Sequence, residues 1–198
     1  MKPINLLMVP GAGRSKLGSS EFDEDKMLVI AENHAQPSGR LLAETLLNDP
    51  KCEVFFIECP PCPRAAAEAI GNRLEVVQLT EDNKDEILEE AGLSNENAKP
   101  TLHDLVDVAL KNKKKVYAAD IMAHLGWPIG DLATKQKRDA QSARAIANKI
   151  KELNGDKSNS KGMLMLWGSG HFSGEKDGLL GDLLKTDGVP YKKLGKSE

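Results

Sequence analysis

Four short, continuous apolar runs constrain the fold of this chain more than any other feature of its sequence. They cover residues 28–30, 54–57, 116–119 and 163–167. A run without polar alternation predicts a strand that is buried on both faces, as in a parallel sheet covered by helices. The runs therefore predict an α/β fold: a compact three-layer domain with a mostly parallel central sheet flanked by helices.

Segments with helical patterning separate these runs, and they predict βαβ units. We expect Ser38 to cap the first helix and a last short strand to begin near Val189. Residues 1–26 are expected to form a lead-in, and residues 27–198 a single domain, because no repeat or linker marks a second boundary. The predicted helices cover residues 39–48, 64–73, 80–91, 100–110, 135–153 and 179–185.

The composition of the 198 residues is that of a globular protein, with 40% hydrophobic and 29% charged residues. A net charge of -3 and an aromatic content of 4% give no reason to expect nucleic acid as a partner. No stretch approaches the ~20 apolar residues of a membrane span. We therefore expect no transmembrane segment, and a location in the cytoplasm or, after export without a cleavable signal peptide, in a host cell.

Two local motifs suggest functions that the surrounding sequence does not favour. Cys59-Pro-Pro-Cys62 has the spacing of a redox or zinc motif, but no second CxxC completes a zinc site. We interpret these residues as reduced cysteines in a turn after a strand. Gly11, Gly13 and Gly18 lack the lysine of a phosphate-binding loop and miss the dinucleotide fingerprint by one residue, so we interpret them as a turn.

Ionisable residues follow each of the four apolar runs. Glu32 and His34 follow the first run, Glu58 the second and Asp120 the third, while His171 follows the fourth after Gly-Ser-Gly. The carboxyl ends of parallel strands meet at one edge of a sheet, where open α/β folds bind ligands. The sequence therefore predicts one site that gathers these five residues.

Two roles suit such a group. A histidine can activate water as a general base while a carboxylate orients it, with no metal. Alternatively, His34, His171 and Glu58 are candidate ligands for a divalent metal ion. Each residue also has a structural alternative, because a carboxylate after a strand can cap the next helix and a histidine near a glycine turn can bond to backbone alone. We interpret His103 and His124 as structural.

The order of these motifs resembles that of a known superfamily. Ile30-Ala-Glu-Asn-His34 is similar to its first signature, a hydrophobic strand followed by Gly-Glu-x-His, and Glu58 looks like its second-strand glutamate. Arg138-Asp139 is similar to its Arg-Asp pair ahead of an alanine-rich helix. Leu166-Trp-Gly-Ser-Gly-His171, with Gly188-Val-Pro190 further on, looks like its closing signature.

This superfamily joins erythromycin esterases (EreA), ChaN-like haem-binding proteins, TraB/Tiki proteases, bacterial effector relatives and a domain of the Pasteurella mitogenic toxin. The resemblance spans roughly residues 27 to 194. Ala31 replaces the glycine that precedes the glutamate in the family, and the long helical insertions of larger members are missing.

The resemblance implies a hydrolase, an esterase or a metal-dependent peptidase, used by a bacterial effector or toxin-type protein on an unidentified small molecule or protein. Glu32 and His34 would position or activate water, and Arg138 would anchor an anionic group. The alternatives are a non-catalytic module that binds haem or a metal, and a cytoplasmic small-molecule esterase; the low aromatic content weighs against haem. The expected catalytic residues are Glu32, His34, Glu58 and His171, with Asp120 and Arg138 in supporting roles.

Overall fold

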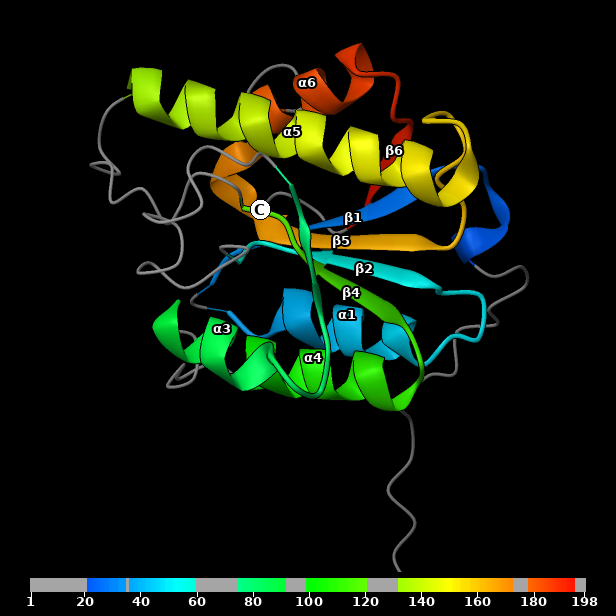
Figure 1. The fold of residues 1–198 in the computed structure, drawn as a ribbon, viewed down its shortest axis with the longest axis vertical. Helices are drawn as coiled ribbons and strands as arrows, with labels where there is room; N and C mark the ends of the chain where they lie inside the picture. The colour runs from blue at the N-terminus through cyan, green and yellow to red at the C-terminus, as the bar shows by residue number, and fades with distance from the viewer. Residues whose placement is uncertain are drawn as a thin grey trace, which may run out of the picture.

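The computed structural model describes residues 21–34, 36–59, 75–91, 99–120, 132–172 and 178–194. Its centre is a six-stranded sheet with the order β3-β4-β2-β5-β1-β6 (Figure 1). Neighbouring strands pair in parallel, except that β3 runs antiparallel to β4. The strands are β1 (Met27–Glu32), β2 (Val54–Ile57), β3 (Val77–Leu79), β4 (Lys115–Ala118), β5 (Met163–Gly168) and β6 (Tyr191–Leu194).

Helices cover both faces of this sheet, so the predicted three-layer α/β fold is confirmed. Helices α1, α3 and α4 lie on one face, and α5 and α6 lie on the other (Figure 1). Two 3-10 turns complete the described elements. The bounds are η1 (Glu21–Asp23), α1 (Ser38–Leu47), α3 (Lys84–Glu90), α4 (Leu102–Lys111), α5 (Leu132–Asn154), η3 (Ser169–His171) and α6 (Gly178–Thr186).

Alternate residues of the central strands pack into two separate cores. In β1, Leu28 and Ile30 join the core under α1 and α4, whereas Met27 and Val29 join the core under α5 and α6. All four are buried. Both faces of the strand thus exclude water, which is why the sequence shows a continuous apolar run instead of polar alternation.

Some observed elements differ from the sequence-based predictions. The prediction that Ser38 caps α1 is wrong: Pro37 is the N-cap residue, and no side chain caps this helix. The helix expected from residue 80 begins at Lys84, because residues 80–83 form a turn in which Asn83 Oδ1 accepts a hydrogen bond from the Thr80 amide. The short antiparallel strand β3 before that turn was not predicted.

Several other predictions fall outside the described residues. These are the helix over residues 64–73, the turn at Gly11, Gly13 and Gly18, and the interpretations of Cys62 and His124. Phe22, within the expected lead-in, is fully buried in the core under α1 and α4. In the part of the chain that is described, no helix combines the length and the apolar composition needed to cross a membrane.

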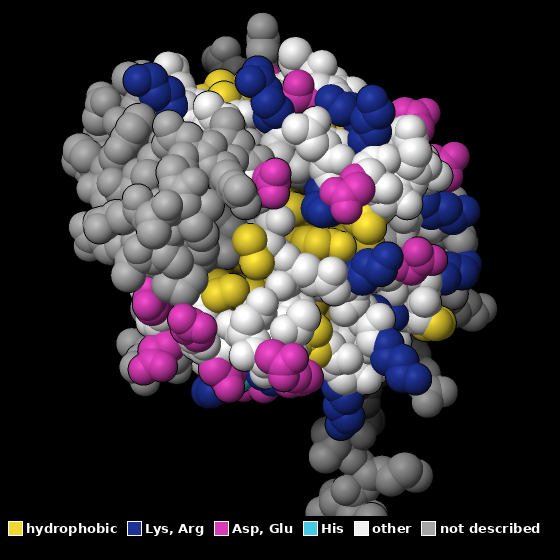
Figure 2. Space-filling view, viewed as in Figure 1, with side chains coloured by type: hydrophobic (Ala, Val, Ile, Leu, Met, Phe, Trp, Pro, Cys, Tyr) yellow, Lys and Arg dark blue, Asp and Glu magenta, His cyan; other side chains and the backbone are white. Residues whose placement is uncertain are grey.

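Charged side chains of both signs lie on the face drawn in Figure 2. Asp and Glu side chains gather at its lower left, where Figure 1 shows α3, and Lys and Arg side chains lie mainly toward its right side.

Candidate functional site

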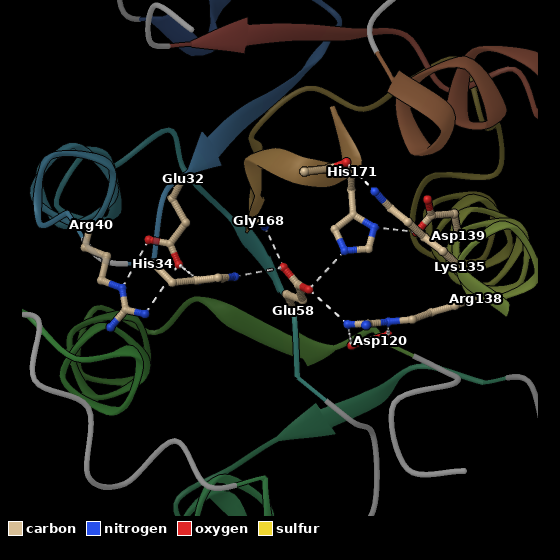
Figure 3. A network of polar contacts seen from close by, with 11 residues as sticks. Glu32, His34, Arg40, Glu58, Asp120, Lys135, Arg138, Asp139, Gly168 and His171 are labelled. Carbon is tan, nitrogen blue, oxygen red and sulfur yellow. Dashed lines mark hydrogen bonds and ion pairs between the residues drawn. The ribbon is translucent and has the colours of Figure 1, made fainter. Parts of the chain in front are cut away.

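A largely buried carboxylate, Glu58, lies at the centre of a polar cluster at the carboxyl edge of the sheet (Figure 3). The residue follows β2 directly, and its side chain is 13% exposed. Its Oε2 accepts a hydrogen bond from the Gly168 amide at 2.5 Å, and its Oε1 accepts one from Arg138 Nη2 at 2.9 Å. His171 Nε2 lies 3.4 Å from Oε1, and His34 Nε2 lies 3.7 Å from Oε2. Glu58 thus faces both imidazoles.

His34 forms the exposed side of the cluster, with 57% of its side chain open to solvent. Its Nδ1 lies 2.9 Å from Oε1 of Glu32, the last residue of β1. When Nδ1–H donates to this carboxylate, Nε2 is left with a lone pair that points toward Glu58. The chain connection from β1 therefore presents an oriented imidazole to solvent.

A buried ion pair holds Glu32 in place. Arg40 of α1 donates from Nε to Glu32 Oε2 at 3.1 Å and from Nη2 to Oε1 at 3.4 Å. Arg40 and Glu32 are 1% and 4% exposed, so the charge of Glu32 is compensated in a region that water does not reach. Gly39 allows this approach, since a Cβ there would lie 2.8 Å from Glu32 Cβ.

His171 lies on the opposite side of Glu58, in the 3-10 turn after β5. Its Nδ1 is 2.5 Å from Oδ1 of Asp139 in α5, and Trp167 meets its ring edge-on with the centroids 6.3 Å apart. Lys135, one helical turn before Asp139, donates to the carbonyl oxygen of Gly170 at 2.5 Å. Helix α5 therefore fixes both the imidazole and the turn that carries it.

Arg138 joins α5 to the ends of two strands. Its Nε donates to Asp120 Oδ1 at 2.7 Å, and its Nη2 contacts Asp120 Oδ2 as well as Glu58. Asp120 follows β4 and is 2% exposed. Nε and Nη2 of Arg138 thus donate to carboxylates of the protein itself. The expected role of Arg138 in binding an anionic substrate group stays a prediction.

The surroundings of both histidines favour the protonated ring. The hydrogen bond with Glu32 raises the pKa of His34 above its usual value, although partial burial works against this. Burial would lower the pKa of His171, but its contacts with Asp139 and Glu58 outweigh burial and raise the pKa to about 9. At neutral pH, His171 is therefore an imidazolium cation.

The two strand-end carboxylates also differ. Burial would raise the pKa of Glu58, but His171, the Gly168 amide and Arg138 together lower it below its usual value. For Asp120, burial dominates over the opposing effect of Arg138 and raises the pKa to about 6. Glu58 is consequently a firmly ionised carboxylate that lies between two imidazoles.

The residues that the sequence suggested as metal ligands do not fit a divalent cation as they lie. Within the described ranges, no group of three or more His, Cys, Asp or Glu side chains is arranged to hold a metal ion. Glu58 already accepts hydrogen bonds from Gly168 and Arg138. The Arg138 guanidinium and the His171 imidazolium beside it would also repel a further cation.

The structure brings all six residues of the predicted site together. The cluster contains four further positions. Three of them lie on helices and the fourth contributes its backbone amide, so the search for ionisable residues after strands did not find them. Of these four, only Asp139 was named from the sequence, as the neighbour of Arg138. His103 lies elsewhere, on α4, with its ring nitrogens 2.9 Å from Asp85 and 3.3 Å from Asp107. The predicted residues are Glu32, His34, Glu58, Asp120, Arg138 and His171; the added ones are Arg40, Lys135, Asp139 and Gly168.

No protein-family model matches this chain, and neither the curated proteins nor the solved structures contain a significant match to it.

Proposed function

We propose that this chain is a hydrolase-like domain of the erythromycin esterase, ChaN and Tiki superfamily, and that the cluster around Glu58 is an active site that adds water to an ester or amide carbonyl. The observation that carries this proposal is the difference between the two imidazoles that face Glu58. His34 is exposed and offers Nε2, whereas the pKa of about 9 keeps His171 protonated. An acid and a base held on either side of one carboxylate suit proton-transfer chemistry.

His34 is the general base in this scheme. Water bound between His34 Nε2 and Glu58 gives its proton to Nε2 as its oxygen bonds to the carbonyl carbon. The Nδ1 proton stays in the hydrogen bond to Glu32, which stabilises the imidazolium that forms. A positioned base of this kind contributes about 10²–10⁴-fold to the rate.

His171 acts at the carbonyl oxygen. As the water oxygen attacks, the π electron pair of the carbonyl moves onto this oxygen, and Nε2–H of His171 stabilises the negative charge. The intermediate then collapses, the bond to the alcohol or amine breaks, and the leaving group takes the proton from His34 Nε2. Loss of one such donor reduces kcat by about 10²–10³-fold.

The test is hydrolysis of a panel of p-nitrophenyl esters and fluorogenic peptides by the wild-type chain and by His34→Gln. We expect kcat/KM to fall by about 10²–10⁴-fold in the variant. Its melting temperature should stay near that of the wild type, because the His34 side chain is 57% exposed. His103→Gln is the matched control, since it removes a histidine that also contacts carboxylates but lies outside the cluster. Full activity in His34→Gln, or no hydrolysis of any substrate by the wild type, would refute the proposal.

The pH profile offers a second check. Activity should rise as His34 loses its proton at a pKa above the usual value for histidine. It should fall again as His171 loses its proton near pH 9. The expected profile of kcat/KM against pH is therefore a bell. A profile that keeps rising beyond pH 10 would show that no protonated His171 takes part.

A further inference from the structure

We infer that Asp139 is a positioning residue for His171: it orients the imidazole and keeps Nδ1 protonated, so that Nε2–H faces Glu58 and the reacting carbonyl. The significance of this role for catalysis rests on the hydrolytic function proposed above. The contact itself does not, because it is a property of the folded protein without substrate.

The geometry around Asp139 carries the inference. The residue is 1% exposed, and its Oδ1 lies 2.5 Å from His171 Nδ1. Its other oxygen, Oδ2, is buried and has no hydrogen-bond partner among the residues that the structure describes. A buried carboxylate needs a compensating charge close by. The imidazolium of His171 supplies that charge, and the carboxylate in turn retains the proton on Nδ1.

Glu32, the carboxylate that contacts His34, lies in a different environment from Asp139. Glu32 receives two hydrogen bonds from Arg40, so its charge is balanced before His34 is considered. The positive charge of Arg40 also acts to lower the pKa of His34. Within the described ranges, His171 is the cation hydrogen-bonded to Asp139, while Arg138 interacts with this carboxylate electrostatically. Arg40 therefore opposes protonation on the His34 side, and no hydrogen-bonded arginine of the described residues does so behind His171.

The remaining charged groups near His171 do not outweigh the effect of Asp139 on the protonation of the ring. Glu58, at the end of β2, faces Nε2 at 3.4 Å and also favours the protonated ring. Lys135 of α5 is bonded to the Gly170 carbonyl, and Arg138 of the same helix is bonded to Glu58 and Asp120. Both carboxylates thus contact the imidazole directly, whereas each cation is bonded to another acceptor.

The test is an NMR titration of the histidine side chains in the wild type, in Asp139→Asn and in Asp156→Asn. The His171 signals are assigned from their loss in His171→Gln. We expect Asp139→Asn to lower the midpoint of the His171 titration by about one pH unit or more, which is about a tenfold loss of proton affinity. Asp156→Asn removes the same charge from an exposed loop after α5 and should leave the midpoint unchanged.

A double-variant comparison separates positioning from a merely structural role. If Asp139 acts through His171, then Asp139→Asn combined with His171→Gln should be no slower than His171→Gln alone. Losses of activity that multiply in the double variant would overturn the inference. So would a His171 titration that is the same in Asp139→Asn and in the wild type.

A third measurement does not use Asp139→Asn, so it tests the inference even if that variant fails to fold. In the wild-type protein the Nδ1 proton of His171 should resonate far downfield, as expected for a short hydrogen bond to a carboxylate. Its absence at neutral pH would also overturn the inference. None of the NMR measurements needs a substrate, so a protein that shows this signal and hydrolyses nothing would refute the proposed function alone.

Discussion

The two halves of the site place the same pair of residue types in opposite electrostatic settings. On the β1 side, the carboxylate behind His34 is neutralised by buried Arg40, and the imidazole is exposed. On the α5 side, the carboxylate behind His171 has the imidazole itself as its compensating cation, and the ring is 11% exposed. A neighbouring carboxylate raises the pKa of both rings, but the cations around each carboxylate differ. On the β1 side, Arg40 acts to lower the pKa of His34.

Breaking the ion pair on the β1 side should have the largest effect on stability. Arg40→Met leaves Glu32 as a buried carboxylate without its cation, which costs about 3–5 kcal/mol of unfolding free energy. For a chain of this size, each kcal/mol lowers the melting temperature by about 2–4 °C. Differential scanning calorimetry measures this directly. Arg144→Met, at an exposed position of α5, is the matched control and should change little. Equal melting of the two variants would show that the buried pair does not stabilise the fold.

The α5 side should instead make stability depend on pH at the alkaline end. The pKa of His171 is raised from 6.5 to about 9, so its contribution to stability is fully present below pH 6.5 and is lost as the pH rises through about 9. The shift corresponds to about 3 kcal/mol, because each pKa unit is about 1.4 kcal/mol. Urea unfolding of the wild type and of His171→Gln should therefore converge between these pH values. Parallel profiles would mean that His171 is not protonated in the folded state.

Substitutions of two glycines, Gly39 and Gly168, should have smaller effects on stability. A methyl group at Gly39 would lie 2.8 Å from Glu32 Cβ, so α1 must move away from β1, and Gly39→Ala should cost about 1–3 kcal/mol. A methyl group at Gly168 would meet the tips of two side chains, His34 Nε2 at 2.9 Å and Glu58 Oε2 at 3.0 Å. Because the exposed His34 ring can rotate away, Gly168→Ala should reduce hydrolysis more than stability.

Thermal melts and the hydrolysis assay, run side by side, check the two glycine variants. Gly170→Ala is the control, since its methyl group would meet only Lys135 Nζ at 3.9 Å within the described structure. If Gly168→Ala is less stable than Gly39→Ala and keeps full activity, the close packing of His34 and Glu58 is unimportant for the reaction.

The strand ends could be predicted because they depend on local pattern. A continuous apolar run such as residues 163–167 indicates a strand buried on both faces, and the parallel pairing of such strands brings their carboxyl ends to one edge. Glu58 and His171 were found in this way. Arg40 was not, because an arginine within an amphipathic helix normally faces solvent, and only the packing of α1 against β1 buries it.

The layers, the parallel order of the strand ends and the ionisable residues that meet there could be predicted from the amino-acid sequence. These follow from hydrophobic periodicity, which is a local property of the chain. The pKa shifts of the histidines, in contrast, depend on the packed structure. His34 and His171 each have a carboxylate beside them, but the pKa of each depends on burial and on charges that α1 and α5 bring close only when they pack against the sheet. Electrostatic energies depend on distance and on exclusion of water, and neither exists until the elements have packed.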